Sequence, residues 1–251
     1  MRLLMMAAAT LSFAAFSLFA QAQPGRQAPS AQEILERADE ARFPQEGFEI
    51  MVRIQTTEDG RPAETRGFKV LSKGNENTIV LTLEPASERG QMMLMRGRDL
   101  WVFLPRVSQP VRISLAQRLT GQVANGDIAR ANFVGDYSPS LAGTERVGND
   151  NFYVLELAAV DRKVTYQRVR YWVRQKDYRP HKAEFYSLAG RLLKTCLYED
   201  FRVMGGKLRP GRLVMTDAIT KGSESRLVYS DLRLRDLPDQ IFTKEYLRRL
   251  D

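Results

Sequence analysis

The chain has few of the residues that build most catalytic and metal-binding sites. Its 251 residues include one cysteine, Cys196, and one histidine, His181. A single cysteine excludes an internal disulfide, so packing must stabilise the fold, and its apolar neighbours predict a buried, inert thiol. The histidine has no Cys or acidic partner at metal-ligand spacing, which is typical of a structural residue. The sequence also lacks a glycine-rich phosphate loop and a G-x-S-x-G elbow. We therefore expect no catalytic residue, no metal, no cofactor and no enzymatic activity.

Charge and hydrophobic content limit the class of protein and its partners. The chain has 38 Lys and Arg against 30 Asp and Glu, a formal net charge of +8, without a dense basic block. A diffuse basic surface favours peripheral contact with anionic membranes or lipid headgroups. The 43% hydrophobic content is sufficient for a sizeable core. The negative mean hydropathy excludes an integral helical membrane protein.

The N-terminus has the pattern of a secretory signal peptide. A cationic start precedes an apolar run that ends in the A-x-A cleavage site Ala20-Gln21-Ala22. We expect cleavage after Ala22, which removes residues 1–22 and lowers the net charge to +7. The alternative is a retained membrane anchor, but the run is short for a span and no basic stop-transfer cluster follows it. No cysteine stands directly after the apolar run, where the new N-terminus could be lipidated. We therefore expect an exported, unanchored protein, in the periplasm if the host has two membranes, and no nucleic-acid partner.

The rest of the chain reads as one domain of mainly β structure. Residues 23–29 form a polar linker, and residues 30–251 form the domain. Ser30 and Glu33 have the spacing of a capping box, which predicts a helix that ends near Arg42. From Phe48 the hydrophobic period changes to two, which indicates half-buried strands. Short strands without helices between them predict an antiparallel meander. The predicted strands cover 48–55, 65–72, 77–84, 90–95, 100–104, 152–160, 164–174, 182–188, 192–201, 213–220 and 225–234, with a turn at Asp59-Gly60 and a short closing helix within 238–250.

The pattern is interrupted between Pro105 and Gly143. Residues 114–119 predict one or two helical turns, and residues 121–126 and 132–139 read as loops. A long irregular insertion inside a meander is more often functional or mobile than part of the core. We therefore interpret residues 114–143 as a lid.

Two neighbouring strands have no polar face. Residues 92–95, Met-Met-Leu-Met, and residues 100–104, Leu-Trp-Val-Phe-Leu, are apolar at successive positions. One interpretation is a curved sheet whose concave side is lined with hydrophobic groups that accept an irregular apolar ligand. The other is a central strand that is buried by packing on both of its faces.

An ordered set of segments resembles a known family. Residues 100–105, Leu-Trp-Val-Phe-Leu-Pro, with Val107 and Arg112-Ile113-Ser114, resemble a segment of the LolA-like outer-membrane lipoprotein-sorting proteins. Further matches, in the family order, are Asn132-Phe133-Val134-Gly135-Asp136-Tyr137, residues 190–194 leading to 205–210, and residues 239–243 with Tyr246-Leu247. The likeness spans nearly all of the chain after the signal peptide and is closer to the uncharacterised branch of the family.

The resemblance implies both a fold and a function. It implies an incomplete, strongly curved antiparallel β-barrel of about eleven strands, with helices covering the concave face. It implies a monomeric periplasmic carrier, or chaperone, whose apolar cavity receives the acyl chains of a lipoprotein or lipid for transfer towards the outer membrane. An inner-membrane lipid exporter is the implied donor. One departure is that Ser72-Lys73-Gly74 stands where the well-studied carrier has Lys-Arg-Pro, so its gating arginine cannot be carried over.

Two sets of residues are the expected site. Alternation along the strands predicts that one set lines a single apolar cavity: Ile50, Val52, Ile54, Phe68, Val70, Ile79, Leu81, Leu83, Leu94 and Trp101. Strand ends predict a basic rim for a lipid headgroup or a partner: Arg96, Arg98, Arg106 and Arg112. Solvated strand ends are the simpler interpretation of these arginines.

Three other functions compete with the carrier. A sensor would bind the same lipid or lipoprotein and regulate a membrane partner. A second domain would favour the sensor, and the chain after the signal peptide is short for two domains. A lipid-modifying hydrolase would need a nucleophile and base that the sequence does not offer. An outer-membrane barrel would need lipid-facing apolar bands, whereas these strands have charged faces.

Overall fold

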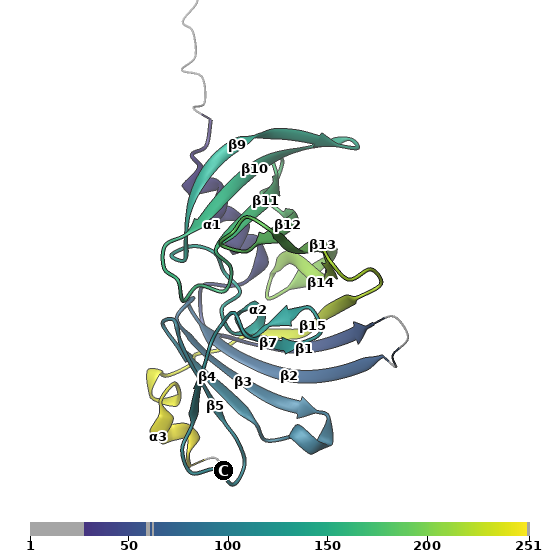
Figure 1. Cartoon of the computed structure of the whole chain (residues 1–251). Helices are drawn as coiled ribbons and strands as arrows, with labels where there is room; N and C mark the ends of the chain where they lie inside the picture. The colour runs from purple at the N-terminus through teal and green to yellow at the C-terminus, as the bar shows by residue number, and fades with distance from the viewer. Residues whose placement is uncertain (1–27, 59–60, 62, 250–251) are drawn as a thin grey trace, which may run out of the picture.

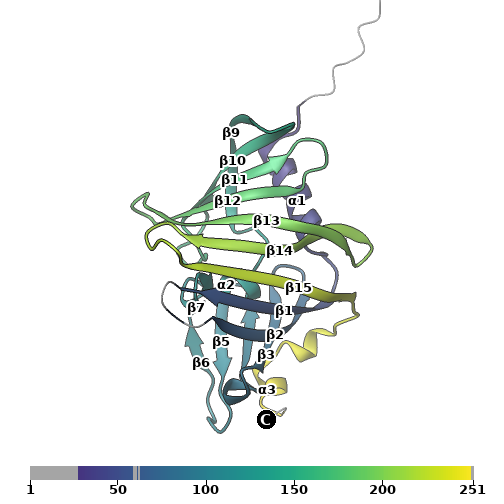
Figure 2. The ribbon, with the colours of Figure 1, turned by 90° about the vertical axis from the view of Figure 1, so that its right-hand side faces the viewer.

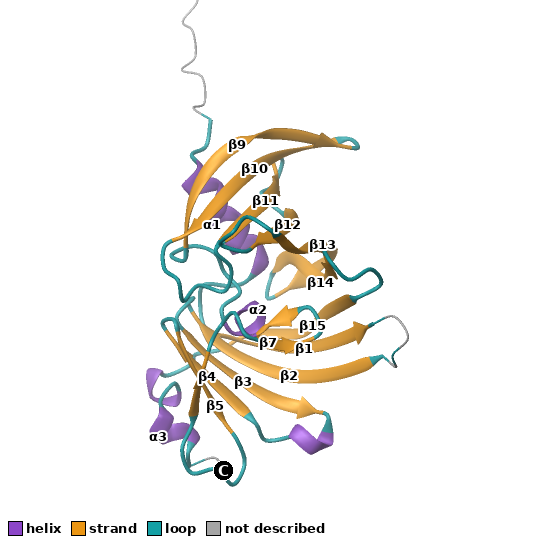
Figure 3. Cartoon of the chain, in the orientation of Figure 1, coloured by secondary structure: helices purple, strands orange, loops and turns teal. Residues whose placement is uncertain are grey.

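The computed structural model describes residues 28–249 apart from 59, 60 and 62. This part of the chain forms a large curved sheet with a few short helices (Figures 1 and 3). The predicted signal peptide, most of the linker and the turn at Asp59-Gly60 lie outside the described residues. The helices are α1 (Ala31–Arg42), α2 (Asn125–Ala129) and α3 (Lys244–Leu247), with 3-10 helices at Ala86–Glu88 and Asp239–Ile241. The strands are β1 (Phe48–Thr57), β2 (Glu64–Lys73), β3 (Asn77–Glu84), β4 (Met92–Arg96), β5 (Asp99–Phe103), β6 (Val111–Ile113), β7 (Arg118–Thr120), β8 (Val123–Ala124), β9 (Tyr137–Val147), β10 (Asp150–Ala159), β11 (Arg168–Arg174), β12 (Pro180–Tyr186), β13 (Leu192–Met204), β14 (Lys207–Asp217) and β15 (Glu224–Leu234).

Thirteen strands form the main sheet in the order β6-β5-β4-β3-β2-β1-β15-β14-β13-β12-β11-β10-β9. Their pairing is antiparallel throughout, and β1 joins the two halves by pairing with both β2 and β15. Figure 2 shows the strands stacked in this order across the molecule. The sheet curves strongly but does not close, because β6 and β9 are its two edges. The incomplete antiparallel barrel that the sequence predicted is confirmed.

The main sheet has two strands more than the eleven expected, β6 and β9. β6 has only three residues, too few to show a period. β9 is an edge strand whose side chains are mostly exposed on both faces, so its sequence does not alternate. It also contains Pro139 and Gly143, which weaken a strand pattern and are tolerated at an edge or a bulge. The register between β9 and β10 does shift next to Gly143.

Helix α1 begins where the sequence predicted and lies within the curve of the sheet (Figure 1). The backbone N–H of Glu33 donates to the Ser30 hydroxyl at 3.1 Å, which caps the helix. The Glu33 carboxylate does not complete the capping box, because it pairs with Arg37 at 2.6 Å. Ile34, Leu35 and Ala38 are fully buried in the main hydrophobic core. The helix thus fills part of the concave side.

Residues 114–136, which we call the plug, fill the rest of the concave side. A turn leads into the β7–β8 hairpin and α2, so the predicted helical turns at 114–119 are wrong and the predicted loop at 121–126 contains β8 and the start of α2. The plug buries six apolar residues in the main core: Leu115, Val123, Ala124, Ile128, Ala129 and Phe133. Tyr137, at the start of β9, is buried in the same core. An insertion without periodicity is therefore well packed, because its contacts are to the sheet and not within itself.

The C-terminal segment covers the opposite, convex face. Leu237, Phe242 and Leu247 form a second core with residues of β3, β4 and β5. Figure 1 shows α3 beside β4 and β5, on the outside of the curve. The strands without a polar face are therefore buried on both sides, by the plug and by the C-terminal segment. Among the helices of the described residues, none has the length and apolar character needed to cross a membrane.

Candidate functional site

The concave face is a continuous apolar surface that is set by the register of the strands. Directly paired residues point to the same face of a sheet. Ile50 pairs with Val70, Val52 with Phe68, and Val70 with Val80. These residues, together with Ile54, are buried in the main core. Five of the ten predicted cavity residues therefore lie on the concave face, on β1 and β2.

Four of the other five predicted cavity residues lie on the convex face, so the prediction of one shared cavity is wrong for them. Leu71 pairs with Ile79, Ile79 with Leu94, and Leu94 with Trp101. Ile79 and Leu94 are buried beneath the C-terminal segment, and Trp101 and Leu81 pack against them. The fifth, Leu83, is the extra residue of a bulge in β3, between Thr82, which pairs with Phe68, and Glu84, which pairs with Gly67, so it has no cross-strand partner that assigns its face. In β3 the more apolar alternating set, with Ile79 and Leu81, lies on the convex face, where the C-terminal segment covers it, so alternation found the set but not the face it occupies. The concave residues of these three strands are Thr78, Val80, Thr82, Met93, Met95, Leu100 and Val102.

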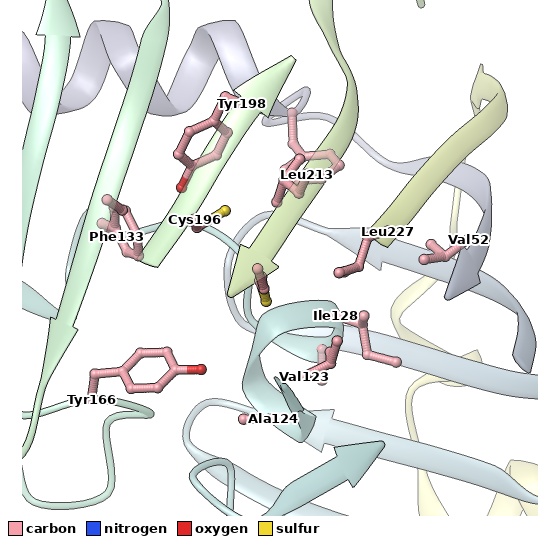
Figure 4. Packing of buried hydrophobic residues seen from close by; sticks show 14 of the residues in the cluster. Val52, Val123, Ala124, Ile128, Phe133, Tyr166, Cys196, Tyr198, Leu213 and Leu227 are labelled. Carbon is pink, nitrogen blue, oxygen red and sulfur yellow. The ribbon is translucent and has the colours of Figure 1, made fainter. Parts of the chain in front are cut away.

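The interior is almost completely filled in this conformation. One void of about 30 Å³ is lined by Ile50, Val52 and Val70 of the sheet and by Ile128 of the plug. Another of about 20 Å³ is lined by Arg42, Phe133 and Tyr198. Each could hold about one water molecule, which is far smaller than an acyl chain. Figure 4 shows Val123 and Ile128 of the plug beside Val52 and Leu227 of the sheet, and Phe133 near Tyr198. A long apolar ligand could enter only if the plug moved.

The first polar anchor of the plug is Asp39 on α1. Its carboxylate accepts the backbone N–H groups of Phe133 and Val134 at 2.6 and 2.7 Å, both on Oδ2. Its other oxygen accepts from Arg42 at 3.3 Å. Asp39 is 1% exposed, and burial raises the pKa of its carboxyl above the usual value although Arg42 and the two N–H donors act in the other direction. A single buried carboxylate thus joins α1 to the plug.

The second anchor is Asp136, which binds two arginines. Arg130 donates from Nη2 to the carboxylate at 2.8 Å and also donates from Nε. Arg98, in the turn between β4 and β5, donates from Nε to the same carboxylate at 2.9 Å and from Nη2 to the Gly135 carbonyl at 2.7 Å. Arg130 also donates to the Gly97 carbonyl at 2.8 Å. These contacts tie the end of the plug to the β4–β5 turn.

The third anchor is Asp127 in α2. Lys194 of β13 donates to it at 2.8 Å, and the Tyr166 hydroxyl donates at 2.8 Å. Asp127 also accepts the backbone N–H of Ala124 at 2.8 Å, which caps α2. Lys194 and Asp127 are both buried. The anchor therefore connects the centre of the plug to the C-terminal half of the sheet.

The four predicted rim arginines do not form one rim. Arg98 is engaged in the anchor at Asp136, and Arg112 pairs with Asp99. Arg96 and Arg106 are exposed. Arg98 precedes β5 and Arg106 follows it, so a five-residue strand, about 17 Å long, separates them. The prediction placed arginines from both ends of β5 at one mouth of the barrel, but the two ends of a strand lie at opposite ends of the barrel wall.

The two rare residues lie where no chemistry is evident. Cys196 is fully buried on the concave face, and burial raises the pKa of its thiol to about 12. The His181 ring packs on Phe152 with centroids 4.7 Å apart, and burial lowers the pKa of its imidazole below the usual value. In the described part of the chain, no group of three or more His, Cys, Asp or Glu residues could hold a metal ion.

The anchoring residues were not predicted as a set, although one signal was present. Asp39 and Arg42 continue the buried stripe of α1 that contains Leu35 and Ala38. Charged residues at apolar positions of an amphipathic helix indicate buried polar contacts. Their partners could not be found from the sequence, because Phe133 lies 94 positions away from Asp39.

The fold and the sequence are similar to those of known proteins. A family profile described as an uncharacterized protein matches residues 74–249. No curated protein matches the chain. A LolA superfamily protein from Nitrosomonas europaea is 60% identical, with a TM-score of 0.84, over 87% of this chain and 100% of that one. A DUF1329 family protein from Desulfovibrio piger is 25% identical, with a TM-score of 0.73, over 86% and 97%. An outer membrane lipoprotein-sorting protein domain from Vibrio parahaemolyticus, 23% identical over 87% and 98% with a TM-score of 0.74, shares the fold.

Proposed function

Since the chain belongs to the LolA superfamily, we propose that it is a periplasmic carrier that binds the acyl chains of a lipoprotein or lipid in its concave face. Each buried CH₂ group contributes roughly 0.8 kcal/mol, so a long acyl chain would cost on the order of 10 kcal/mol to expose to water. Such a cargo crosses an aqueous compartment only inside a protein. The task needs binding and release, and no catalytic residue.

The observation that supports this proposal is an apolar interior closed by a polar-anchored plug. The plug buries Leu115, Ile128 and Phe133 against the concave face, and its removal would leave an apolar surface that acyl chains could cover. The burial lost by the plug side chains would be replaced by the burial of the ligand. Asp39, Asp127 and Asp136 fix the closed position, so the polar contacts of the plug are few and can break together, while its apolar contacts can be replaced by those of the ligand. The plug covers residues 114–136 of the lid that the sequence predicted at 114–143, whereas residues 137–143 belong to β9 of the main sheet. Movement of the plug is part of the proposal.

The proposed direction of transfer is from the inner membrane towards the outer membrane. An inner-membrane exporter would load the carrier, which would work as a monomer. The exposed Arg96 and Arg106 would make peripheral contact with anionic headgroups at the two ends of β5. Such contacts are weakened by salt.

Lipid uptake tests the proposal. The protein without its signal peptide is mixed with vesicles that contain a phospholipid with a fluorescent acyl chain, and the lipid recovered with the protein is measured. Saturable uptake is expected. Val70 lines the concave void, and its neighbour Leu71 lies on the convex face, so Val70→Thr and Leu71→Thr are a matched pair. Val70→Thr should weaken binding about tenfold because it places a hydroxyl against the acyl chain. Equal effects of both substitutions, or no uptake by the wild type, would contradict the proposal.

A further inference from the structure

Three polar atoms in the concave interior have no hydrogen-bond partner among the described residues. They are Nε of Arg42, Oη of Tyr171 and Oδ1 of Asn132. Buried polar groups are nearly always paired, because an unpaired one costs about 1–3 kcal/mol. Two of the three, the guanidinium and the phenol, are hydrogen-bond donors. A buried pair of unused donors is a feature that the plug contacts do not explain.

Arg42 is buried with little to bind. It is 5% exposed, and the hydrogen bond found for its guanidinium is the long contact of 3.3 Å with Asp39. The other carboxylate oxygen of Asp39 is used by the plug backbone. The guanidinium lies over the ring of Phe133, 4.5 Å from its centroid, and 5.4 Å from that of Tyr198. The Arg42 guanidinium is therefore held against aromatic rings, and its Nε donor has no partner.

Tyr171 reaches the same plug residue from the sheet. It lies on β11, is fully buried, and packs edge-to-face on Phe133 with centroids 5.2 Å apart. The 20 Å³ void beside Arg42 and Phe133 lies next to this cluster. Phe133 therefore packs on both residues that have unused donors, Arg42 from α1 and Tyr171 from the sheet. If the plug withdrew, both donors would face the cavity that it left.

We propose that Arg42 and Tyr171 form a polar anchor that binds the ester carbonyl at the head of an acyl chain once Phe133 has withdrawn. The inference rests on the proposed carrier function and specifies the ligand class as esterified acyl chains. A carbonyl oxygen has two lone pairs and can accept from both donors. A neutral acceptor fits better than a carboxylate, because Asp39 already balances the charge of Arg42 and a second buried anion would be unpaired.

Three probes of equal chain length separate the contributions: methyl palmitate, palmitate and hexadecane. Binding of each to the full protein without its signal peptide is measured for the wild type, for Tyr171→Phe and for a matched control, Tyr137→Phe. Tyr137 also packs edge-to-face on Phe133, at 5.4 Å, but its hydroxyl donates to the Tyr166 carbonyl at 3.1 Å. Both substitutions remove one buried hydroxyl beside the same ring.

Tyr171→Phe should weaken methyl palmitate binding about three- to tenfold and leave hexadecane binding unchanged. It should not lower the urea midpoint, because the lost hydroxyl is unpaired in the closed protein. Tyr137→Phe should lower the urea midpoint and leave the ratio of ester to hydrocarbon binding unchanged. Arg42→Gln should reduce that ratio further than Tyr171→Phe, because a charged donor binds more strongly.

Each contrary outcome is informative. Equal loss of methyl palmitate and hexadecane binding in Tyr171→Phe would mean that the residue acts by packing, and would overturn the anchor. Tighter binding of palmitate than of its methyl ester, lost in Arg42→Gln, would overturn the neutral acceptor in favour of an anionic one. Binding of all three probes without any effect of the variants would overturn the anchor and leave the carrier function standing. If none of the probes binds, the carrier function itself fails.

Discussion

Replacing Asp39 with alanine removes the acceptor that joins α1 to the plug. The carboxylate receives two short backbone hydrogen bonds from Phe133 and Val134 and a longer one from Arg42. Breaking a buried charge pair by removing one partner costs about 3–5 kcal/mol. We expect the lower end, about 3 kcal/mol, because burial of this carboxylate already raises its pKa and so offsets part of its contribution. If these 3 kcal/mol are lost only from the closed conformation of the plug, the population of the open conformation rises by about a hundredfold.

Native-state hydrogen exchange is the assay, with urea unfolding beside it. Asp39→Ala should accelerate exchange of the Phe133 and Val134 amides and of the rest of the plug, while β10–β13 stay protected. Asp39→Asn should have a smaller effect, because one amide oxygen can still accept both backbone N–H groups. Asp217 is a matched control, since its carboxylate also accepts two backbone N–H groups, at 2.6 and 2.9 Å, but in an exposed turn. Unchanged protection of the plug in Asp39→Ala, or an equal effect of Asp217→Ala, would refute the anchor.

Three further predictions concern residues outside the anchors. Cys196 lies on the concave face with its thiol pKa raised to about 12, so alkylation of the native protein should be slow, and Asp39→Ala should accelerate it; fast labelling of the wild type would contradict this. Leu94→Ala should lower the free energy of unfolding by about 2–5 kcal/mol without changing acyl-chain affinity, because Leu94 is buried on the convex face; a loss of affinity at full folding would argue against that assignment. Burial lowers the pKa of His181 below its usual 6.5, so the unfolded chain binds the proton first. Wild-type stability should therefore fall as the pH drops below about 6.5, and His181→Gln should show a smaller fall in urea titrations.

Local patterns predicted most of the elements of this fold. The capping residue Ser30 and the period of two from Phe48 onward have consequences within a few residues, and both were confirmed. β9 was missed because an edge strand with exposed faces has no hydrophobic alternation. The plug was read as irregular because each of its short elements packs on distant strands. Its helix α2 has only five residues, too few for a periodic signal.

The site was only partly predictable, and the reason is the register of the sheet. Val52 and Ile54 alternate with Arg53 and Gln55, and Phe68 lies between Gly67 and Lys69, so these three could be placed on one face. Ile79, Val80 and Leu81 are consecutive apolar residues, and the sequence alone could not reveal that Val80 alone of the three faces inward. The contacts that close the interior join residues far apart in the chain, as Lys194 and Asp127 do. Such contacts are set by the folded sheet and not by local spacing.

The central claim is that the concave face is an acyl-binding cavity that the plug closes. Native mass spectrometry of the protein purified from its own cells tests it most directly, because a bound cargo would be retained and weighed. We predict a population heavier than the processed chain by the mass of an acylated molecule, which organic extraction removes and which is reduced in Val70→Thr but not in Leu71→Thr. The account would be contradicted if the wild type showed only the mass of the processed chain and if Asp39→Ala, in which the plug opens more often, also carried no added mass.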